Sequence, residues 1–389
     1  MTPGPQAAHP GRARRLSSMR RSALVLAGLA ICLSAPARAE RHSNMGPFAI
    51  EKLVGPPSAL HALISTGVDC PKAPEPVVSL DTESRYDPKD RKAIEVDEDR
   101  AAAYREKVAP VRDYLRAVVE AANRSVAEPH ARRAWADCAA GLLDGWAEAG
   151  ALSEMETTTA KLIRGSQIAG LSLAALQLGD ALDADDPRMG RIAAWLAGLA
   201  RDGRAFVDSR PEASSSRANH RYWNGLAAAA AGSLAGDGAL IDWGIDSARI
   251  GLAQVDANGF LPLELARGKR ARDYHIYAIA PLVMIAEIAA SRGLDLYAEH
   301  DHALRRLGGA VIASIADPEP MAAAAGAPQL PFKGDAEGPP SHRLAWLEPF
   351  LRRTPNEEGA ALLAAARPTS YSALGGDLTL LFSQGLNDR

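Results

Sequence analysis

Aromatic residues, cysteine and an excess of charge of either sign are all scarce in this sequence. Phe, Trp and Tyr make up 5% of its 389 residues, there are three Cys, and the formal net charge is −3. Such a charge gives no global attraction to nucleic acid or to an anionic surface, so a polyanionic ligand would need a local basic site. We therefore predict no nucleic-acid partner and no membrane partner.

Long apolar runs are also rare. The run Ala23–Leu33 is too short to span a membrane, and no later stretch is expected to be long enough. Arg20 and Arg21 precede this run and a small-residue site (Ala-Arg-Ala, 37–39) follows it, which is the pattern of a secretory signal. We predict a signal peptide over residues 1–39 and a periplasmic mature protein. Its removal lowers the 44 basic residues to 38 against 47 acidic ones, a net charge near −9.

The few cysteines fit this compartment. Cleavage after residue 39 removes Cys32 and leaves Cys70 and Cys138. Two thiols in an oxidising compartment usually form a disulfide. This one would attach the N-terminal segment to the helix around Trp135–Trp146. The alternative is a pair of buried free thiols.

Alternating β-branched runs are scarce, whereas Ala, Leu and Ile recur at three-to-four spacing after Asp97, as in amphipathic helices. The pattern predicts helices over 97–127, 130–149, 153–182, 187–208, 216–233, 237–255, 270–292, 295–315 and 341–366. Short breaks rich in Gly, Asp or Pro separate them, which favours antiparallel helical hairpins in an all-α fold. Such hairpins form a toroid, a plain bundle or a superhelical array, and no fixed repeat period supports the array.

The remaining segments lack this periodicity. Residues 40–95 are predicted to be an extended N-terminal arm, and residues 385–389 a C-terminal tail. The stretch 318–340 is rich in Pro, Gly and Ala and is predicted to be a long loop or lid. The helical domain then covers residues 96–384.

Patterns for metal, phosphate and nucleophile sites are missing as well. His300 and His302 form the only close His pair, at a helix start where such residues are common on the surface. No second cluster has metal-ligand spacing. The sequence also lacks a Gly-rich phosphate loop after a strand and a Gly-x-Ser-x-Gly elbow. We predict neither a cofactor nor a metal.

Two segments concentrate polar, basic and aromatic residues. The first is Arg217–Trp223, in which Asn219 and His220 each lie about one helical turn from Trp223. The second is Gly259–Tyr277, whose last eleven residues hold four cations, one His and two Tyr. An aromatic helix start and a solvated basic turn are the ordinary interpretations.

Together these segments meet the needs of β-elimination from a uronic acid. The C6 carboxylate must be neutralised, a base must remove the C5 proton, and an acid must protonate the departing O4. Asn219, Arg267, His220 and Tyr274 supply these groups without a metal. Trp223 is predicted to stack on a sugar ring.

In these segments the sequence resembles polysaccharide lyase family 5, the mannuronate-specific alginate lyases. The shared motifs are Asn-His-x-Tyr-Trp at 219–223, Gly-x-Leu-Pro-x-Glu at 259–264, the Arg-rich turn 267–272, Tyr-His-x-Tyr-Ala at 274–278, Ala-Trp-Leu-Glu-Pro at 345–349 and Leu-Gly-Gly-Asp-Leu-Thr at 374–379. The likeness implies an α/α toroid (an incomplete α/α barrel) with an open cleft, and the disulfide between Cys70 and Cys138. It also implies β-elimination that leaves 4,5-unsaturated uronate ends.

The resemblance further implies roles for single residues. Asn219 and Arg267 would neutralise the carboxylate, with His220 as base and Tyr274 as acid. In mannuronate the C5 proton and O4 lie on the same side of the ring, so the alternative is that Tyr274 moves both protons and His220 helps to hold the carboxylate. The predicted substrate-binding residues are Arg85, Tyr86, Trp223, Arg270 and Tyr277.

Three positions depart from the family pattern. The family's Lys-Tyr near the N-terminus is Arg85-Tyr86, the Arg before Leu-Gly-Gly is Ala373, and the first Asn of Asn-Asn-His is Ala218. Arg and Lys are not equivalent where geometry matters. The prediction is a monomeric lyase of polymannuronate. The alternatives are a lyase of another polyuronate, such as glucuronan or hyaluronan, and an inactive periplasmic polysaccharide-binding protein.

Overall fold

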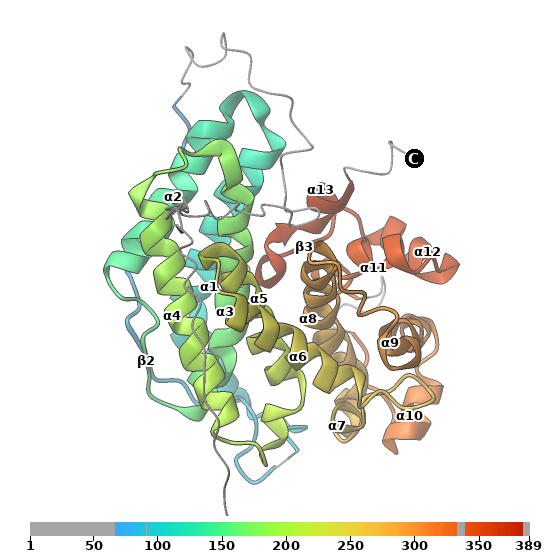
Figure 1. The fold of residues 1–389 in the computed structure, drawn as a ribbon. Helices are drawn as coiled ribbons and strands as arrows, with labels where there is room; N and C mark the ends of the chain where they lie inside the picture. Colours follow the sequence, from blue (N-terminus) through green and yellow to red (C-terminus); the bar gives the residue numbers. More distant parts are fainter. Residues whose placement is uncertain (1–66, 91, 333–338, 384–389) are drawn as a thin grey trace, which may run out of the picture. The chain divides into compact units, whose positions relative to one another are not determined.

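The structure is a computed structural model that describes residues 67–90, 92–332 and 339–383, and these residues are mainly α-helical (Figure 1). The predicted signal peptide, residues 40–66 of the arm and the tail 385–389 lie outside the described residues.

Thirteen α-helices occur in the described part of the chain. They are α1 Glu98–Ala127, α2 Arg132–Glu148, α3 Thr158–Leu178, α4 Pro187–Asp208, α5 Asn219–Ala235, α6 Gly238–Leu252, α7 Pro262–Leu265, α8 Ala271–Ser291, α9 Glu299–Ala316, α10 Glu319–Ala325, α11 Leu347–Arg353, α12 Glu357–Ala366 and α13 Leu378–Ser383. Two small ladders pair β1 Ser79–Leu80 with β2 Glu154–Met155 in parallel and β3 Ser370–Tyr371 with β4 Gly376–Asp377 antiparallel. The all-α prediction is confirmed.

The predicted helix boundaries hold to within about five residues as far as α9, but two predictions near the C-terminus are wrong. The segment 341–366 forms two helices, because Pro355 interrupts the hydrogen-bond ladder and Asn356 caps α12 by accepting from the Gly359 amide. The predicted loop 318–340 contains α10, whose run of Ala favours helix.

Helix α5 packs against α3, α4, α6 and α8 (Figure 1). Every residue from Arg221 to Gly232 is buried, as expected of a helix whose residues are mainly apolar all round, with Arg221 and Asn224 as the polar exceptions. Gly225 and Gly244 allow the backbones of α5 and α6 to approach, since a Cβ on Gly244 would lie 2.5 Å from the Gly225 carbonyl oxygen. This packing fixes the N-terminus of α5, where Asn219 and His220 are located.

The segment Gly268–Ser291, which includes α8, has the length and apolar composition of a membrane-spanning helix. This corrects the expectation that no stretch beyond the N-terminus is long enough. In the structure 78% of its most apolar window is buried inside the protein, as in the core helix of a water-soluble fold.

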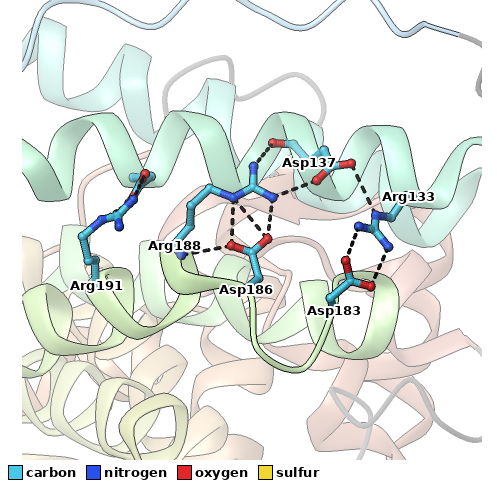
Figure 2. A network of polar contacts seen from close by, with 7 residues as sticks. Arg133, Asp137, Asp183, Asp186, Arg188 and Arg191 are labelled. Carbon is cyan, nitrogen blue, oxygen red and sulfur yellow. Dashed lines mark hydrogen bonds and ion pairs between the residues drawn. The ribbon is translucent and has the colours of Figure 1, made fainter.

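An ion-pair network joins α2 to α4 and to the loop before α4 (Figure 2). The Arg188 guanidinium donates to Asp137 at 2.8 Å and also to Asp186, and Arg133 donates to Asp183 at 2.7 Å. The first contact of Arg188 crosses between the two helices. Although exposed pairs each contribute little, a network of bidentate contacts fixes the register of the helices better than isolated pairs do.

The described part of the N-terminal arm lies against the helices. A disulfide joins Cys70 to Cys138 on α2, which confirms that prediction. Further along, the Leu152 amide donates to the Val77 carbonyl, and Tyr86 forms an isolated bridge with Val96. These contacts hold the segment that carries Arg85 and Tyr86.

A candidate active site

A pocket of about 550 Å³ contains all four predicted catalytic residues, Asn219, His220, Arg267 and Tyr274. It also contains four of the five predicted substrate-binding residues. The other lining residues come from the arm, α1, α3, the turns before α5 and α8, α8 itself and the C-terminal segments: Ser84, Arg85, Tyr86, Ala93, Tyr104, Arg112, Thr159, Leu162, Ile163, Ser166, Ser215, Arg270, Asp273, Ile276, Tyr277, Ala280, His342, Arg343 and Tyr371. The structure thus brings the two conspicuous sequence segments to one place.

A chain of hydrogen bonds leads from the arm to Tyr274. Arg85 donates to the Tyr86 hydroxyl oxygen at 3.0 Å, and the hydroxyl oxygens of Tyr86 and Tyr274 are 2.7 Å apart. Because a guanidinium only donates, the hydroxyl hydrogen of Tyr86 is free to point at Tyr274. The hydroxyl hydrogen of Tyr274 is then available to a different acceptor.

Arg267 lies against the Tyr274 ring, with its guanidinium carbon 3.8 Å from the ring centroid. Burial raises the pKa of the Tyr274 hydroxyl, with a contribution from Tyr86, and Arg267 opposes this rise. Tyr274 is therefore protonated at neutral pH, the state that a general acid requires.

His220 occupies the first turn of α5. Burial, and next the nearby Arg267, lower the pKa of its imidazole to about 4, while a hydrogen bond with the Leu162 backbone opposes the shift. The ring is therefore neutral at neutral pH and can accept a proton.

Asn219 forms hydrogen bonds through its backbone amide and its side-chain amide with one buried carboxyl group, that of Glu264. Its backbone amide donates to Glu264 Oε1 at 2.9 Å, and its Nδ2 lies 3.0 and 3.1 Å from the two carboxyl oxygens. Asn219 Oδ1 has no hydrogen-bond partner among the described residues. Burial raises the pKa of Glu264, against its hydrogen bonds with Asn219 and the charge of Arg267. Sequence reasoning placed Glu264 in a motif but gave it no role.

The described lining of the pocket is strongly basic. It includes five arginines but a single carboxylate, that of Asp273, which pairs with Arg343. Another of the five arginines, Arg112, donates a hydrogen bond to the backbone carbonyl of Arg105. A chain with a negative net charge therefore has a positively charged pocket suited to an anionic ligand.

The prediction that Trp223 stacks on a sugar is wrong. Its side chain is 0% exposed and does not line the pocket. The ring packs 5.0 Å from that of Tyr277 and 5.9 Å from that of Tyr371, centroid to centroid. Position 223 lies on the core side of α5, one turn beyond the two residues that reach the pocket, so Trp223 supports the site from behind.

Several lining residues were missed by sequence reasoning. Tyr104, Arg112, His342, Arg343 and Tyr371 come from segments far apart in the chain, and no local motif indicates them. Ala373, at the position where the family pattern carries an Arg, is buried and does not line the pocket. Arg112 and Arg343 are the cations that sequence reasoning had not assigned.

The chain is similar in sequence to known alginate lyases. The sequence profile described as alginate lyase matches residues 82–321. An alginate lyase of Azotobacter vinelandii is 34% identical over 329 residues, which cover 80% of this chain and 84% of that protein. A polysaccharide lyase of Stenotrophomonas maltophilia is 35% identical over 255 residues, which cover 64% of this chain and 73% of that protein.

The fold is similar to that of solved lyases. Alginate lyase A1-III from Sphingomonas species A1 superposes with a TM-score of 0.67 at 23% identity, covering 88% of this chain and 96% of that one. A variant of alginate lyase A1-III complexed with a tetrasaccharide gives a TM-score of 0.69 at 23% identity, covering 87% and 95%. The predicted α/α toroid is confirmed by this likeness. The chain belongs to the alginate lyase family of polysaccharide lyases.

Proposed function

We propose that this lyase cleaves mannuronate-rich alginate by β-elimination and leaves a 4,5-unsaturated uronate at the new non-reducing end. The observation that carries the proposal is the grouping of Asn219, His220, Arg267 and Tyr274 in one basic pocket. The pocket offers cations for the polymer's carboxylates, a neutral base and a protonated acid.

In the proposed reaction Arg267 and Asn219 hold the C6 carboxylate of the sugar whose C5 proton is removed. Neutralising that carboxylate makes the C5 proton more acidic and stabilises the enolate-like charge that develops. His220 takes the C5 proton, the C4–C5 double bond forms, and the C4–O4 bond breaks. Tyr274 donates its proton to O4, so that the departing chain leaves with a hydroxyl group. No water molecule is consumed.

The contact with Tyr86 supports Tyr274 as the proton donor. After the transfer Tyr274 is a phenolate, and the Tyr86 hydroxyl at 2.7 Å can donate to it. Arg85, which donates to Tyr86, strengthens that contact by polarising the Tyr86 hydroxyl. The arm thereby stabilises the charge left on the acid.

A substrate panel tests the proposal. Purified protein is incubated with polymannuronate, polyguluronate, glucuronan and hyaluronan, and the ultraviolet absorbance of the unsaturated product is followed. We expect polymannuronate to react fastest. A faster reaction on glucuronan or hyaluronan would retain the lyase chemistry and replace the substrate, whereas no absorbance on any polyuronate over a wide pH range would contradict the proposal.

The matched control for the panel is Tyr274→Phe, which removes the hydroxyl and keeps the ring beside Arg267. We expect kcat to fall by roughly 10²- to 10⁴-fold, the usual contribution of a general acid. Binding of polymannuronate should change little. Unchanged turnover in this variant would exclude Tyr274 as the acid.

The periplasm is the compartment that we propose for the mature enzyme. The disulfide between Cys70 and Cys138 supports this, since disulfides persist in oxidising compartments. Cell fractionation followed by mass determination of the N-terminus tests it, with cleavage expected after residue 39. Recovery of the full-length chain from the cytosol would contradict the proposal.

A further inference from the structure

We propose that Glu264 is a positioning residue that carries a proton and donates it in a hydrogen bond to Asn219 Oδ1, so that the amide NH₂ group of Asn219 faces the substrate carboxylate. This inference rests on the proposed function, because it assigns the contact between Asn219 and the uronate. It concerns a residue that touches Asn219 and does not line the pocket.

The orientation of the Asn219 amide conflicts with its proposed contact to the substrate carboxylate. With Nδ2 directed at Glu264, the other end of the amide is Oδ1, and this atom has no hydrogen-bond partner among the described residues. Asn219 lines the pocket and Glu264 does not, so the amide end turned away from Glu264, which carries the buried Oδ1, is the end left for the substrate. A carbonyl oxygen only accepts, and it would repel a carboxylate instead of neutralising it.

Exchanging the two ends of the amide removes the conflict. The oxygen and the nitrogen of an Asn amide have nearly the same shape, and their assignment follows from the hydrogen bonds around them. In the exchanged orientation Oδ1 faces the Glu264 carboxyl group, and only a protonated carboxyl can donate to it. The other carboxyl oxygen still accepts from the Asn219 backbone amide, the contact of 2.9 Å that fixes the start of α5.

The surroundings of Glu264 favour the protonated form. Its side chain is 1% exposed, and no ion pair joins it to a cation within the described ranges. The titratable groups that interact with it are Arg267, whose charge favours the carboxylate, and Tyr222 on α5, whose hydroxyl donates to the Arg217 carbonyl. A buried carboxylate without an ion pair is costly, and the raised pKa of Glu264 reflects that cost.

The decisive variant is Glu264→Gln, which has nearly the same shape and cannot ionise. Gln Oε1 accepts from the Asn219 backbone amide, and Gln Nε2 then needs an acceptor at the position of Asn219. Only Oδ1 provides one, so the variant imposes the proposed orientation. We expect kcat/KM on polymannuronate to stay within about threefold of wild type, a small loss for a substitution that keeps both hydrogen bonds.

If Glu264 is instead ionised in the active enzyme, the same variant should lose activity. If Glu264 acted as an anion that accepts from Asn219 Nδ2, Gln would place one NH₂ group against another. The loss of kcat/KM would then be of the order of 100-fold, as for a misaligned catalytic group, and that result would overturn the inference. Glu264→Ala, which removes both contacts, is the control and should raise KM and lower kcat.

The pH profile separates positioning from a purely structural effect. Wild-type kcat/KM should fall as pH rises through the pKa of Glu264, because the carboxylate form accepts a hydrogen bond from the Asn219 NH₂ group and turns it away from the substrate. Glu264→Gln should lack this alkaline decline. The same decline in both proteins would overturn the inference.

A second measurement is independent of activity. A protonated carboxylic acid has its own infrared carbonyl band, which we expect in wild type at neutral pH and not in Glu264→Gln. If the band is present while the wild-type enzyme cleaves no polyuronate, the proposed function fails and the proton on Glu264 remains. If the enzyme is active but wild type shows no carbonyl band that Glu264→Gln lacks, the inference about Glu264 fails and the proposed function stands.

Discussion

Arg267 influences both groups that are proposed to move protons. Its charge lowers the pKa of the His220 imidazole and opposes the burial-driven rise in the pKa of the Tyr274 hydroxyl. The first effect keeps the base neutral, and the second makes the acid easier to ionise than burial alone would allow. One guanidinium thus sets the protonation states of two neighbours as well as binding the substrate carboxylate in the proposed mechanism.

The lowered pKa of His220 predicts where the acid side of the pH profile lies. His220 is neutral above its pKa of about 4, so kcat/KM should persist well below the ordinary titration range of histidine and fall only near pH 4. Steady-state rates on polymannuronate from pH 3.5 to 8, with circular dichroism to confirm folding, measure this. A decline centred near pH 6.5 would contradict the environment assigned to His220. A profile without any acid decline in the folded protein would favour Tyr274 as both base and acid.

Trp223 provides a prediction that separates support of the site from contact with the substrate. Trp223→Phe leaves a void behind Tyr277 and should lower the free energy of unfolding by about 1–3 kcal/mol. KM for polymannuronate should remain near the wild-type value because the side chain is fully buried. Thermal denaturation and steady-state kinetics check the two parts. A large rise in KM without a loss of stability would restore the stacking role that the sequence predicted.

At the scale of elements, the arm and the helices depend on each other. The arm supplies Arg85 and Tyr86 to a pocket whose other residues come mainly from helices and the turns between them. Its described part is attached to α2 by the disulfide and to β2 by one short ladder. Removing an attachment should therefore affect both stability and binding.

The double variant Cys70→Ser with Cys138→Ser tests this dependence. The bridge spans 68 residues, and the loss of such a cross-link from the unfolded chain lowers the free energy of unfolding by about 4 kcal/mol in the chain-entropy description. We also expect a higher KM, because the arm that carries Arg85 is less constrained. Denaturant titration and kinetics give the two quantities, and wild-type protein treated with a reductant is the control. Stability equal to wild type would show that the ladder of β1 with β2 holds the arm without the disulfide.

At the scale of the whole molecule, two histidines make folding sensitive to acid. His275 is 0% exposed, accepts from the Leu261 amide through Nε2 and lies 2.7 Å from the Ala271 carbonyl through Nδ1, which fixes a neutral ring. Burial lowers its pKa to about 4, as it does for His220. The unfolded chain binds a proton at each of these positions near pH 6.5, before the folded protein does.

Stability should therefore be fully present above about pH 6.5 and decline as the pH falls toward 4. The pKa of each histidine falls from about 6.5 in the unfolded chain to about 4 in the folded protein, so each contributes roughly 3 kcal/mol to this decline. In His275→Gln the decline should be smaller by that amount, although the variant starts from a lower stability at pH 7. Denaturant titrations at a series of pH values measure the slope. Equal slopes in the two proteins would mean that His275 is not held neutral by the fold.

The sequence by itself determined the all-α class and most helix boundaries, and it predicted the candidate reactive side chains that the structure brings into one pocket. These properties are local: periodicity depends on residues three or four apart, and the segments around Asn219 and Tyr274 are short and chemically unusual. The break at Pro355 and helix α10 also depend on local sequence. They were not predicted because the Pro, Gly and Ala residues in these stretches favour helix at some positions and loop at others.

Only the tertiary structure decided what surrounds each reactive group. Tyr86 meets Tyr274 across 188 residues of sequence, Asn219 meets Glu264 across 45, and Trp223 turns to the core although its neighbours reach the pocket. Protonation states follow from burial and from charges that non-local packing brings near, so no pattern along the chain could give them. The sequence thus indicated which residues carry the chemistry, and packing decided the state in which each of them is held.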